Sequence, residues 1–398
     1  MNAMNNVWKL YGARFFQSLI PAYVIERLFW EQRGMTIEHV VYTEILYAVT
    51  IVLLEVPTGI LADRFGRKKL VVLAAALGCA EFLILLYAQT FWHFAAVVVL
   101  AGIASAASSG SENALLYDSL RRHGRERQFE QKLGRLNGID FGAAILAALS
   151  GGWLAGRFDL ELNYWLSLIG AVAGLGFALS LAEPPVSAEE KGEAIPIRRY
   201  VAEAWRFFRS RGDVRLVLVA AMVVGASFDY VDEFWQLYLD RFGVPLAWFG
   251  PFSAALLALQ LPGSLLADSL RRRVPTRGLL AAIVAVFALG LGFVAAGPGL
   301  AGAAALLAVC FASGVVDPLA TGYLHHRIDG TMRATIDSFQ SLAGNGVAMV
   351  VGLGFGWCSA RWDVFGGYGF IAVLCAAFLL YFLPASRRIQ ESGRFAAE

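Results

Sequence analysis

The sequence predicts an all-α membrane protein with about twelve transmembrane helices in two six-helix halves. Its 398 residues are 58% hydrophobic and only 16% charged, whereas a soluble domain carries about 25% charged residues. The run from Gly278 to Val316 holds 39 residues without Asp, Glu, Lys or Arg. As one helix, rising about 1.5 Å per residue, it would be about twice as long as a bilayer core is thick. The Gly297-Pro298-Gly299 tripeptide inside it therefore indicates a turn between two spans.

Each predicted span is an apolar run that ends at a polar, glycine or proline cluster. The first six runs lie near residues 8–30, 39–62, 70–90, 94–118, 134–156 and 161–182. After a polar linker, six more follow near residues 214–239, 245–267, 278–297, 300–324, 334–358 and 364–384. The first residues, Met1 to Asn6, contain no cationic segment of the kind that opens a signal peptide, so we expect no removable leader.

The cationic residues gather on one side of these spans. When Arg135 and Arg215 are counted with their adjoining loops, 26 of the 33 Lys and Arg residues lie in the loops after the second, fourth, sixth, eighth and tenth spans or in the C-terminal tail. Loops rich in Lys and Arg face the cytoplasm. We therefore expect both termini to be cytoplasmic in a bacterial inner membrane, which agrees with an even number of spans.

A linker at residues 183–213 separates the two predicted halves, residues 1–182 and 214–398. It begins Glu183-Pro184-Pro185, and its second part places apolar residues at helical spacing among arginines: Ile197, Val201, Ala204, Trp205 and Phe208. This pattern predicts an amphipathic basic helix that lies on the inner leaflet. A flexible linker with chance periodicity is the alternative.

The two halves repeat one another. An offset of 205 residues aligns the segment from Pro57 to Asp63 with the segment from Pro262 to Asp268, and it aligns Arg67 with Arg272. An offset of 204 residues aligns Gly152-Trp153 with Gly356-Trp357. Two nearly equal offsets at distant places predict a parallel repeat of six helices.

The loop between the second and third spans, residues 59–69, holds one carboxylate and four cationic side chains. Gly59 would allow two helices to approach closely. Asp63 would accept from the exposed N–H groups at the positive end of a neighbouring helix. Arg64 and Arg67 would pair with carboxylates or with anionic lipid. The alternative is that the loop serves only as a positively charged topology signal.

The pattern of this loop is G-x-L-A-D-R-x-G-R-K-x, and it includes Gly59, Asp63, Arg64, Gly66 and Arg67. It resembles the signature loop between the second and third helices of major facilitator superfamily transporters. The resemblance implies the major facilitator fold and a cytoplasmic gate, so we call residues 59–69 the gate loop. In that family the loop closes against the eleventh span, whose inner end here would be near Arg333-Ala334-Thr335. Asp268 and Arg272 form a degenerate second copy.

Other segments resemble bacterial twelve-span drug exporters of this superfamily. They are the segments from Glu55 to Gly59, from Gly110 to Leu120, and from Arg333 to Thr335. Two features depart from drug/proton antiporters. The fourth span has no arginine, and the fifth span lacks the Gly-Pro of the antiporter signature.

Charges at membrane depth usually face a cavity or a partner, so they indicate the working site. Arg14 lies about two turns into the first span, and Glu112 and Asp118 lie at a similar inner depth on the fourth. We expect Arg14 to pair with Glu112 or with Asp118. Asp140 on the fifth span is a candidate for the same cluster. Such a pair would bind a proton or substrate, or it would hold two helices together.

The seventh span carries a second acidic cluster. Asp229, Asp232 and Glu233 share one helix face, because they are spaced at i, i+3 and i+4. Carboxylates so close together repel one another when they are ionised, and this repulsion favours proton uptake. The aromatic residues interleaved with them, Phe228, Tyr230, Phe234, Trp235 and Tyr238, would suit a lipophilic cation through cation–π attraction. The alternative is a helix end that is simply wet.

Other polar groups are weaker candidates. Asp317-Pro318 on the tenth span would line the cavity at a broken helix, or it would be a kink with a locally satisfied carboxylate. We interpret Glu26, Glu44, Glu55 and Glu81, and also His325-His326, as interfacial. The four cysteines, Cys79, Cys310, Cys358 and Cys375, lie in apolar runs and are expected to be small buried residues.

These patterns predict a secondary active transporter that exports amphipathic small molecules in exchange for protons by alternating access. No spacing resembles a metal site, a nucleotide-binding loop or a catalytic triad, so we expect no enzyme activity, no cofactor and no nucleic-acid partner. Nothing in the sequence demands more than a monomer. The alternatives are export of an endogenous metabolite such as a siderophore, proton symport, and a sensor or scaffold that does not transport.

Overall fold

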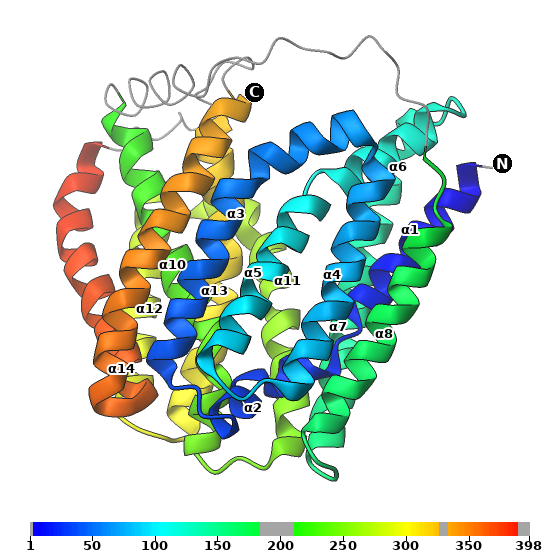
Figure 1. The fold of residues 1–398 in the computed structure, drawn as a ribbon. Helices are drawn as coiled ribbons and strands as arrows, with labels where there is room; N and C mark the ends of the chain where they lie inside the picture. The colour runs from blue at the N-terminus through cyan, green and yellow to red at the C-terminus, as the bar shows by residue number, and fades with distance from the viewer. Residues whose placement is uncertain (1–2, 184–210, 326–332, 389–398) are drawn as a thin grey trace. The chain divides into compact units, whose positions relative to one another are not determined.

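The computed structural model describes residues 3–183, 211–325 and 333–388 of the chain. Every regular element in these ranges is a helix (Figure 1), as predicted. In the first half of the chain the elements are α1 (Ala3–Ser18), η1 (Pro21–Ile25), α2 (Glu26–Gln32), α3 (Ile37–Phe65), α4 (Arg67–Tyr87), α5 (Phe91–Ser108), α6 (Ser111–Arg121), η2 (Glu126–Gln128), α7 (Phe129–Ala155) and α8 (Glu161–Ser180).

The second half of the chain continues in the same way. Its elements are α10 (Gly212–Arg241), η3 (Leu246–Trp248), α11 (Phe249–Arg273), α12 (Thr276–Ala295), α13 (Leu300–His325), α14 (Arg333–Ala385) and η5 (Ser386–Arg388). Ten helical segments of the described chain are long and apolar enough to cross a membrane. The protein is therefore a multi-pass membrane protein. The amphipathic helix predicted around Trp205 lies outside the described residues.

Two breaks explain why ten segments accommodate the twelve predicted spans. The first predicted span, residues 8–30, is not one helix, because Pro21 has no N–H to continue the ladder after α1. The chain instead passes through η1 into α2. At the other end, α14 runs for 53 residues but leaves helical geometry at Trp362 and Asp363. That break separates the predicted spans at 334–358 and 364–384.

The fourth predicted span, residues 94–118, is also interrupted. Helix α5 ends at Ser108 and α6 begins at Ser111, with Gly110 between them at φ +72°. This backbone region costs glycine little and other residues more. The break starts a new helix just before Glu112, which lies in the first turn of α6.

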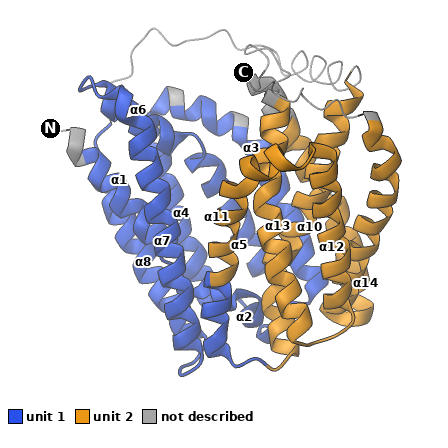
Figure 2. Cartoon of the chain, turned by 180° about the vertical axis from the view of Figure 1, so that it is seen from behind, with its two compact units in different colours: residues 1–191, 244–254 blue, residues 192–243, 255–398 orange. Residues whose placement is uncertain are grey.

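The chain forms two compact units, coloured separately in Figure 2: residues 1–191 with 244–254, and residues 192–243 with 255–398. In the first unit, α1 packs on α6, α7 and α8. Its buried core joins Val7 and Leu10 of α1 to Val71 of α4 and to Leu115 and Leu116 of α6. Among membrane helices, such contacts stabilise through packing more than through water exclusion.

Small residues set the closest approaches in the first unit. A Cβ on Gly152 of α7 would meet the backbone of Gly250, and a Cβ on Gly151 would meet the backbone of Pro21. Glycine therefore lets α7 pack directly on two neighbouring segments, as small residues do between membrane helices.

In the second unit, α10 packs on α13 and α14, and α12 packs on the same two helices. Aromatic rings fill the space between α10 and α14. Tyr230, Phe234 and Phe355 stack on one another with ring centroids 4.9 to 6.4 Å apart. The Tyr230 hydroxyl donates to the Ala348 carbonyl at 3.0 Å. The aromatic residues of α10 are thus largely core residues.

The turn inside α14 is fastened to α10. Asp363 has φ 54° and ψ −165°, a backbone region that glycine occupies far more readily than other residues. Its carboxylate accepts from Arg241 Nε at 2.8 Å. The ion pair therefore holds a strained residue at the corner between the last two spans.

Replacement of Asp363 tests this strain. Asp363→Gly and Asp363→Val both lose the ion pair, but only valine places a β-branched side chain at positive φ. We expect the valine variant to be less stable than the glycine variant by about 1–3 kcal/mol. Thermal unfolding in detergent micelles measures the difference, and equal midpoints for the two variants would contradict it.

Candidate functional site

The gate loop is held by contacts within the first unit. Gly66, at φ +102°, turns the chain between α3 and α4. The Arg67 guanidinium forms an ion pair with Asp118 of α6 and donates to the Ala114 carbonyl at 3.3 Å. Asp118 therefore pairs with the gate loop. The predicted alternative, a pair between Arg14 and Asp118, is not formed within the described residues.

Glu183 closes the gate loop from the other side. Its carboxylate accepts from the backbone N–H groups of Arg67 and Lys68, both at 2.9 Å. N–H groups in the first turn of a helix have no acceptor within that helix, and negative charge is favourable there. Local sequence patterns do not predict this cap, because Glu183 lies more than 110 residues from Arg67 in the chain.

Other members of the gate loop are less constrained. Arg64 is exposed and lies over the Phe65 ring at 5.6 Å. Within the described part of the first unit, a Cβ on Gly59 would meet no heavy atom within 4 Å, so the close approach predicted there is not present. The side chain of Asp63 lies outside the described residues. So do the side chains from Arg333 to Thr335 and those of His325 and His326.

The second copy of the motif makes a different contact. Asp268 and Arg272 form an ion pair within one turn of α11, at 2.8 Å. Both side chains are exposed, at 68% and 79%. The first copy thus joins two helices through Arg67, whereas the second pairs along a single helix.

A polar cluster joins α1, α6 and α7 inside the first unit. Arg14 Nη2 lies 2.7 Å from Glu112 Oε2, and the side chain of Glu112 is only 8% exposed. Ser18, one turn after Arg14 on α1, donates to the carboxylate of Asp140 on α7. Asp140 is also close enough for its charge to act on Glu112. The structure therefore forms the predicted Arg14–Glu112 pair and places Asp140 beside it.

A second cluster surrounds Arg27, which is 6% exposed. Its Nη2 lies 3.2 Å from Glu44 Oε1 of α3, and its Nη1 lies 3.9 Å from Glu26 Oε1. The guanidinium also lies over the Trp30 ring at 4.3 Å. Glu81 of α4 is near enough to interact electrostatically with Glu26.

This second cluster joins Glu26 and Glu44, which the sequence analysis interprets as interfacial, through one shared guanidinium. Glu26 and Glu44 both lie within ion-pair distance of the buried Arg27 guanidinium, and Glu81 lies near Glu26. A signal was available in the sequence, because all three fall within or beside predicted spans. Span boundaries alone did not show that separate spans bring them together.

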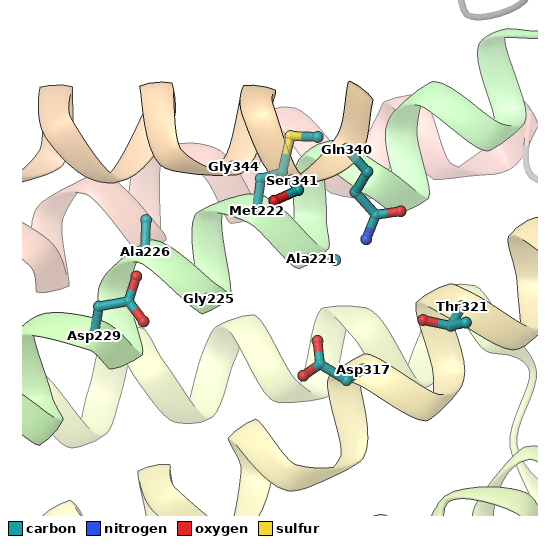
Figure 3. A pocket seen from close by; sticks show the side chains of 10 residues that line it. All are labelled: Ala221, Met222, Gly225, Ala226, Asp229, Asp317, Thr321, Gln340, Ser341 and Gly344. Carbon is teal, nitrogen blue, oxygen red and sulfur yellow. The ribbon is translucent and has the colours of Figure 1, made fainter. Parts of the chain in front are cut away.

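In the second unit, Asp229 lines a pocket with a volume of about 360 Å³. Asp317 lines it from α13, which continues through Pro318 without the break that one of the two predicted alternatives required. Figure 3 shows both carboxylates beside the cavity. The residues that line the pocket are Ala221, Met222, Gly225, Ala226, Asp229, Asp317, Thr321, Gln340, Ser341 and Gly344.

The pocket separates the members of the predicted acidic cluster on α10. Asp229 belongs to its lining, and Asp232 and Glu233 do not. The interleaved aromatic rings do not line it either, because Tyr230, Phe234 and Tyr238 are buried in the core of the unit. The predicted aromatic setting for a cation is therefore absent from this pocket.

The cysteines of the described residues form no disulfide, and no metal-binding cluster is present among these residues. The four cysteines are free; Cys310 and Cys375 are buried, and the other two are half-buried. Cys310 Sγ donates to the Leu256 carbonyl at 2.9 Å, as a small core residue does. Within the described ranges, no group of three or more His, Cys, Asp or Glu side chains is placed to hold a metal ion.

The sequence pattern of one known family, described as the Major Facilitator Superfamily, matches residues 12–353. The chain belongs to the major facilitator superfamily. This match spans the gate loop, both polar clusters of the first unit and the pocket of the second. Members of the superfamily are membrane transporters of small molecules, so this facilitator is a transporter.

Curated relatives of the facilitator match only in part. It is 24% identical over 197 residues to a bicyclomycin resistance protein homolog of Haemophilus influenzae, covering 49% of this chain and 48% of the relative. It is 30% identical over 166 residues to the multidrug resistance protein MdtG of Salmonella paratyphi C, covering 40% of this chain and 38% of the relative. The matches thus span less than half the length of these relatives.

Solved structures resemble the facilitator over nearly its whole length. The nucleoside transporter NupG aligns with a TM-score of 0.77 at 15% identity, covering 97% of this chain and 99% of NupG. A D-xylose-proton symporter aligns with a TM-score of 0.67 at 13% identity, covering 97% of this chain and 98% of the symporter. At such low identity these likenesses show the fold alone.

The Arg67–Asp118 pair of the facilitator can be measured by a double-mutant cycle. We expect Arg67→Gln and Asp118→Asn to be non-additive, with a coupling of about 0.5–3 kcal/mol, because the two side chains are only 19% and 24% exposed. Thermal unfolding in detergent gives the four stabilities.

The repeat-related pair provides the matched control. Arg272→Gln and Asp268→Asn should couple by only about 0.3–0.5 kcal/mol, as exposed pairs one turn apart do. Equal coupling in the two pairs would show that Arg67 and Asp118 do not fasten the gate loop to α6.

Proposed function

We propose that this transporter is a secondary active exporter of small amphipathic molecules in the bacterial inner membrane, driven by inward movement of protons. Two of its partial relatives carry drug-resistance names. The distribution of Lys and Arg supports cytoplasmic termini. The proposal treats the protein as a monomer without nucleic-acid partners, enzyme activity or a cofactor, with the proton gradient as its energy source.

The observation that carries the proposal is an excess of carboxylates over cations in the two polar clusters of the first unit. Arg14 serves Glu112, with Asp140 beside the pair. Arg27 serves both Glu44 and Glu26. One guanidinium can neutralise only one of two carboxylates, and an extra negative charge is costly at membrane depth. Proton binding removes that charge, so each cluster is suited to load and release a proton.

Coupling requires that the two loads favour different states. A ligand shifts a conformational equilibrium only as far as its affinity differs between the states. In the proposed cycle, substrate enters from the cytoplasm while the gate loop is open, and protons enter from outside to reach a carboxylate cluster. In the second unit, the candidate proton-binding residues are Asp229, Asp232 and Glu233. In the first unit, the candidates are the carboxylates of the clusters around Arg14 and Arg27.

One specific observation bears on the rival function, export of an anionic metabolite such as a siderophore. That function would use Arg14 to contact the anion. Arg14 is already paired with Glu112 at 2.7 Å, so an anion would have to displace a nearly buried carboxylate. The geometry therefore favours a neutral or cationic substrate. Proton symport is the other rival, and the direction of transport decides it.

Proteoliposomes with an imposed pH gradient test the proposal. We expect substrate to move against its own gradient, with protons moving in the opposite direction. Glu112→Gln and Glu44→Gln should each reduce this uphill transport at least tenfold, because each removes a titratable carboxylate, while downhill exchange of substrate persists. Asp240→Asn is the matched control, since Asp240 is an exposed carboxylate that pairs with the adjacent Arg241.

Two results would contradict proton-coupled export. One is substrate movement that ignores the pH gradient in the wild type. The other is accumulation of substrate on the side toward which protons flow, which would make the protein a symporter.

A further inference from the structure

The pocket of the second unit is built by three helices. Asp229 comes from α10, Asp317 and Thr321 come from α13, and Gln340 and Ser341 come from α14. Asp317 and Thr321 are four residues apart, so they face the same side of α13. Figure 3 shows Asp229 toward one end of the cavity, with Asp317 and Gln340 further along it.

The space in the pocket is made by small residues. Gly225 of α10 and Gly344 of α14 both line it, and a Cβ on either would meet no heavy atom within 4 Å. The cavity, at about 360 Å³, is at the small end of the range for ligand sites, which is about 300–1,000 Å³. It therefore suits a compact ligand group.

The side chains that line the pocket are acidic or neutral. It includes two carboxylates, one amide and two hydroxyl groups, and its ten residues include no Lys, Arg, His or aromatic side chain. Within the described residues, Asp317 makes no ion pair. Carboxylates only accept hydrogen bonds when ionised, and hydroxyl and amide oxygens can also accept. The pocket thus offers negative charge and many acceptors.

Two kinds of organic cation differ in what they require from a site. A quaternary ammonium has no N–H group and is typically recognised by aromatic faces. A primary ammonium has three N–H donors and needs acceptors. Pairing these donors with charged acceptors gives strong hydrogen bonds, which a quaternary ammonium cannot form.

We infer that this pocket binds the primary ammonium group of an aliphatic amine, with Asp317 as its carboxylate acceptor and with Asp229 adding negative charge toward the other end of the cavity. The oxygens of Thr321, Gln340 and Ser341 complete the set of acceptors. As the binding site of the exported substrate, the pocket rests on the proposed function, and it narrows the substrate class from amphipathic molecules to amphipathic amines. The inference distinguishes this chain from a transporter that selects lipophilic quaternary cations.

The test compares two probes that differ only in their N–H groups, hexylamine and hexyltrimethylammonium. Calorimetric titration of the full chain in detergent measures binding without any gradient. We expect hexylamine to bind at least tenfold more tightly. Asp317→Asn should abolish this preference, and Asp240→Asn on the outer end of α10 should retain it. Equal affinities, tighter binding of the quaternary probe, or no binding of either would overturn the inference.

A steric variant keeps the result interpretable if Asp317→Asn does not fold. Gly225→Leu places a side chain in the cavity, and it has room to do so. It should remove hexylamine binding. Gly292→Leu is the matched control, because Gly292 is an exposed helical glycine of α12 with equally open surroundings. Retained binding in Gly225→Leu would place the amine elsewhere.

The two proposals fail separately. If hexylamine binds as expected but is not moved by a pH gradient in proteoliposomes, the site is correct and proton-coupled export is wrong. If hexylamine is exported but Asp317→Asn and Gly225→Leu leave its binding unchanged, export is correct and this pocket is not the amine site.

Discussion

The cost of placing charge inside a membrane is the constraint on which this structure depends. A charged side chain within a span must find a partner or face a cavity. The described helices meet this requirement across helix boundaries. Arg14 pairs with Glu112 inside the predicted spans, whereas Arg67 pairs with Asp118 and Arg241 pairs with Asp363 at span ends. Apolar side chains gain little free energy when they move from lipid into a contact between helices. Each ion pair therefore helps to fix the position of one segment against another.

The ion pairs differ in their balance of charge. This difference distinguishes pairs that only hold helices together from clusters that we propose to bind a proton or a substrate. Arg67 with Asp118 is a pair of one cation and one carboxylate, and so is the Asp268–Arg272 pair. Such pairs hold an arrangement without binding anything further. The groups around Arg14 and Arg27 contain more carboxylates than cations, and the pocket of the second unit contains carboxylates without a lining cation. In the proposed mechanism, these are the places where a proton or a cationic substrate supplies the missing charge.

Hydropathy and Lys/Arg placement were enough to predict the fold class, because long apolar runs have few alternatives in a membrane. The breaks at Gly110 and Pro21 were harder, since each divides a continuous apolar run. An ion pair between two helices could be predicted only where few charged residues lie at the same depth in the membrane, as for Arg14 and Glu112. The pairing of Glu26 and Glu44 with Arg27, the approach of Glu81 to Glu26, and the cap from Glu183 depend on how separate spans rotate about their axes. The aromatic residues of α10 were misassigned for the same reason, because periodicity gives a shared face but not which face is buried.

The central claim is that carboxylates in this transporter exchange protons for a cationic substrate. Proton release on substrate binding tests it most directly, without membranes or gradients. Hexylamine would be added to the detergent-solubilised protein in weakly buffered solution containing a pH indicator. Competition between the two loads predicts that protons are released as the amine binds, and that Glu112→Gln or Asp317→Asn releases fewer. Saturable amine binding without any proton release would contradict the account.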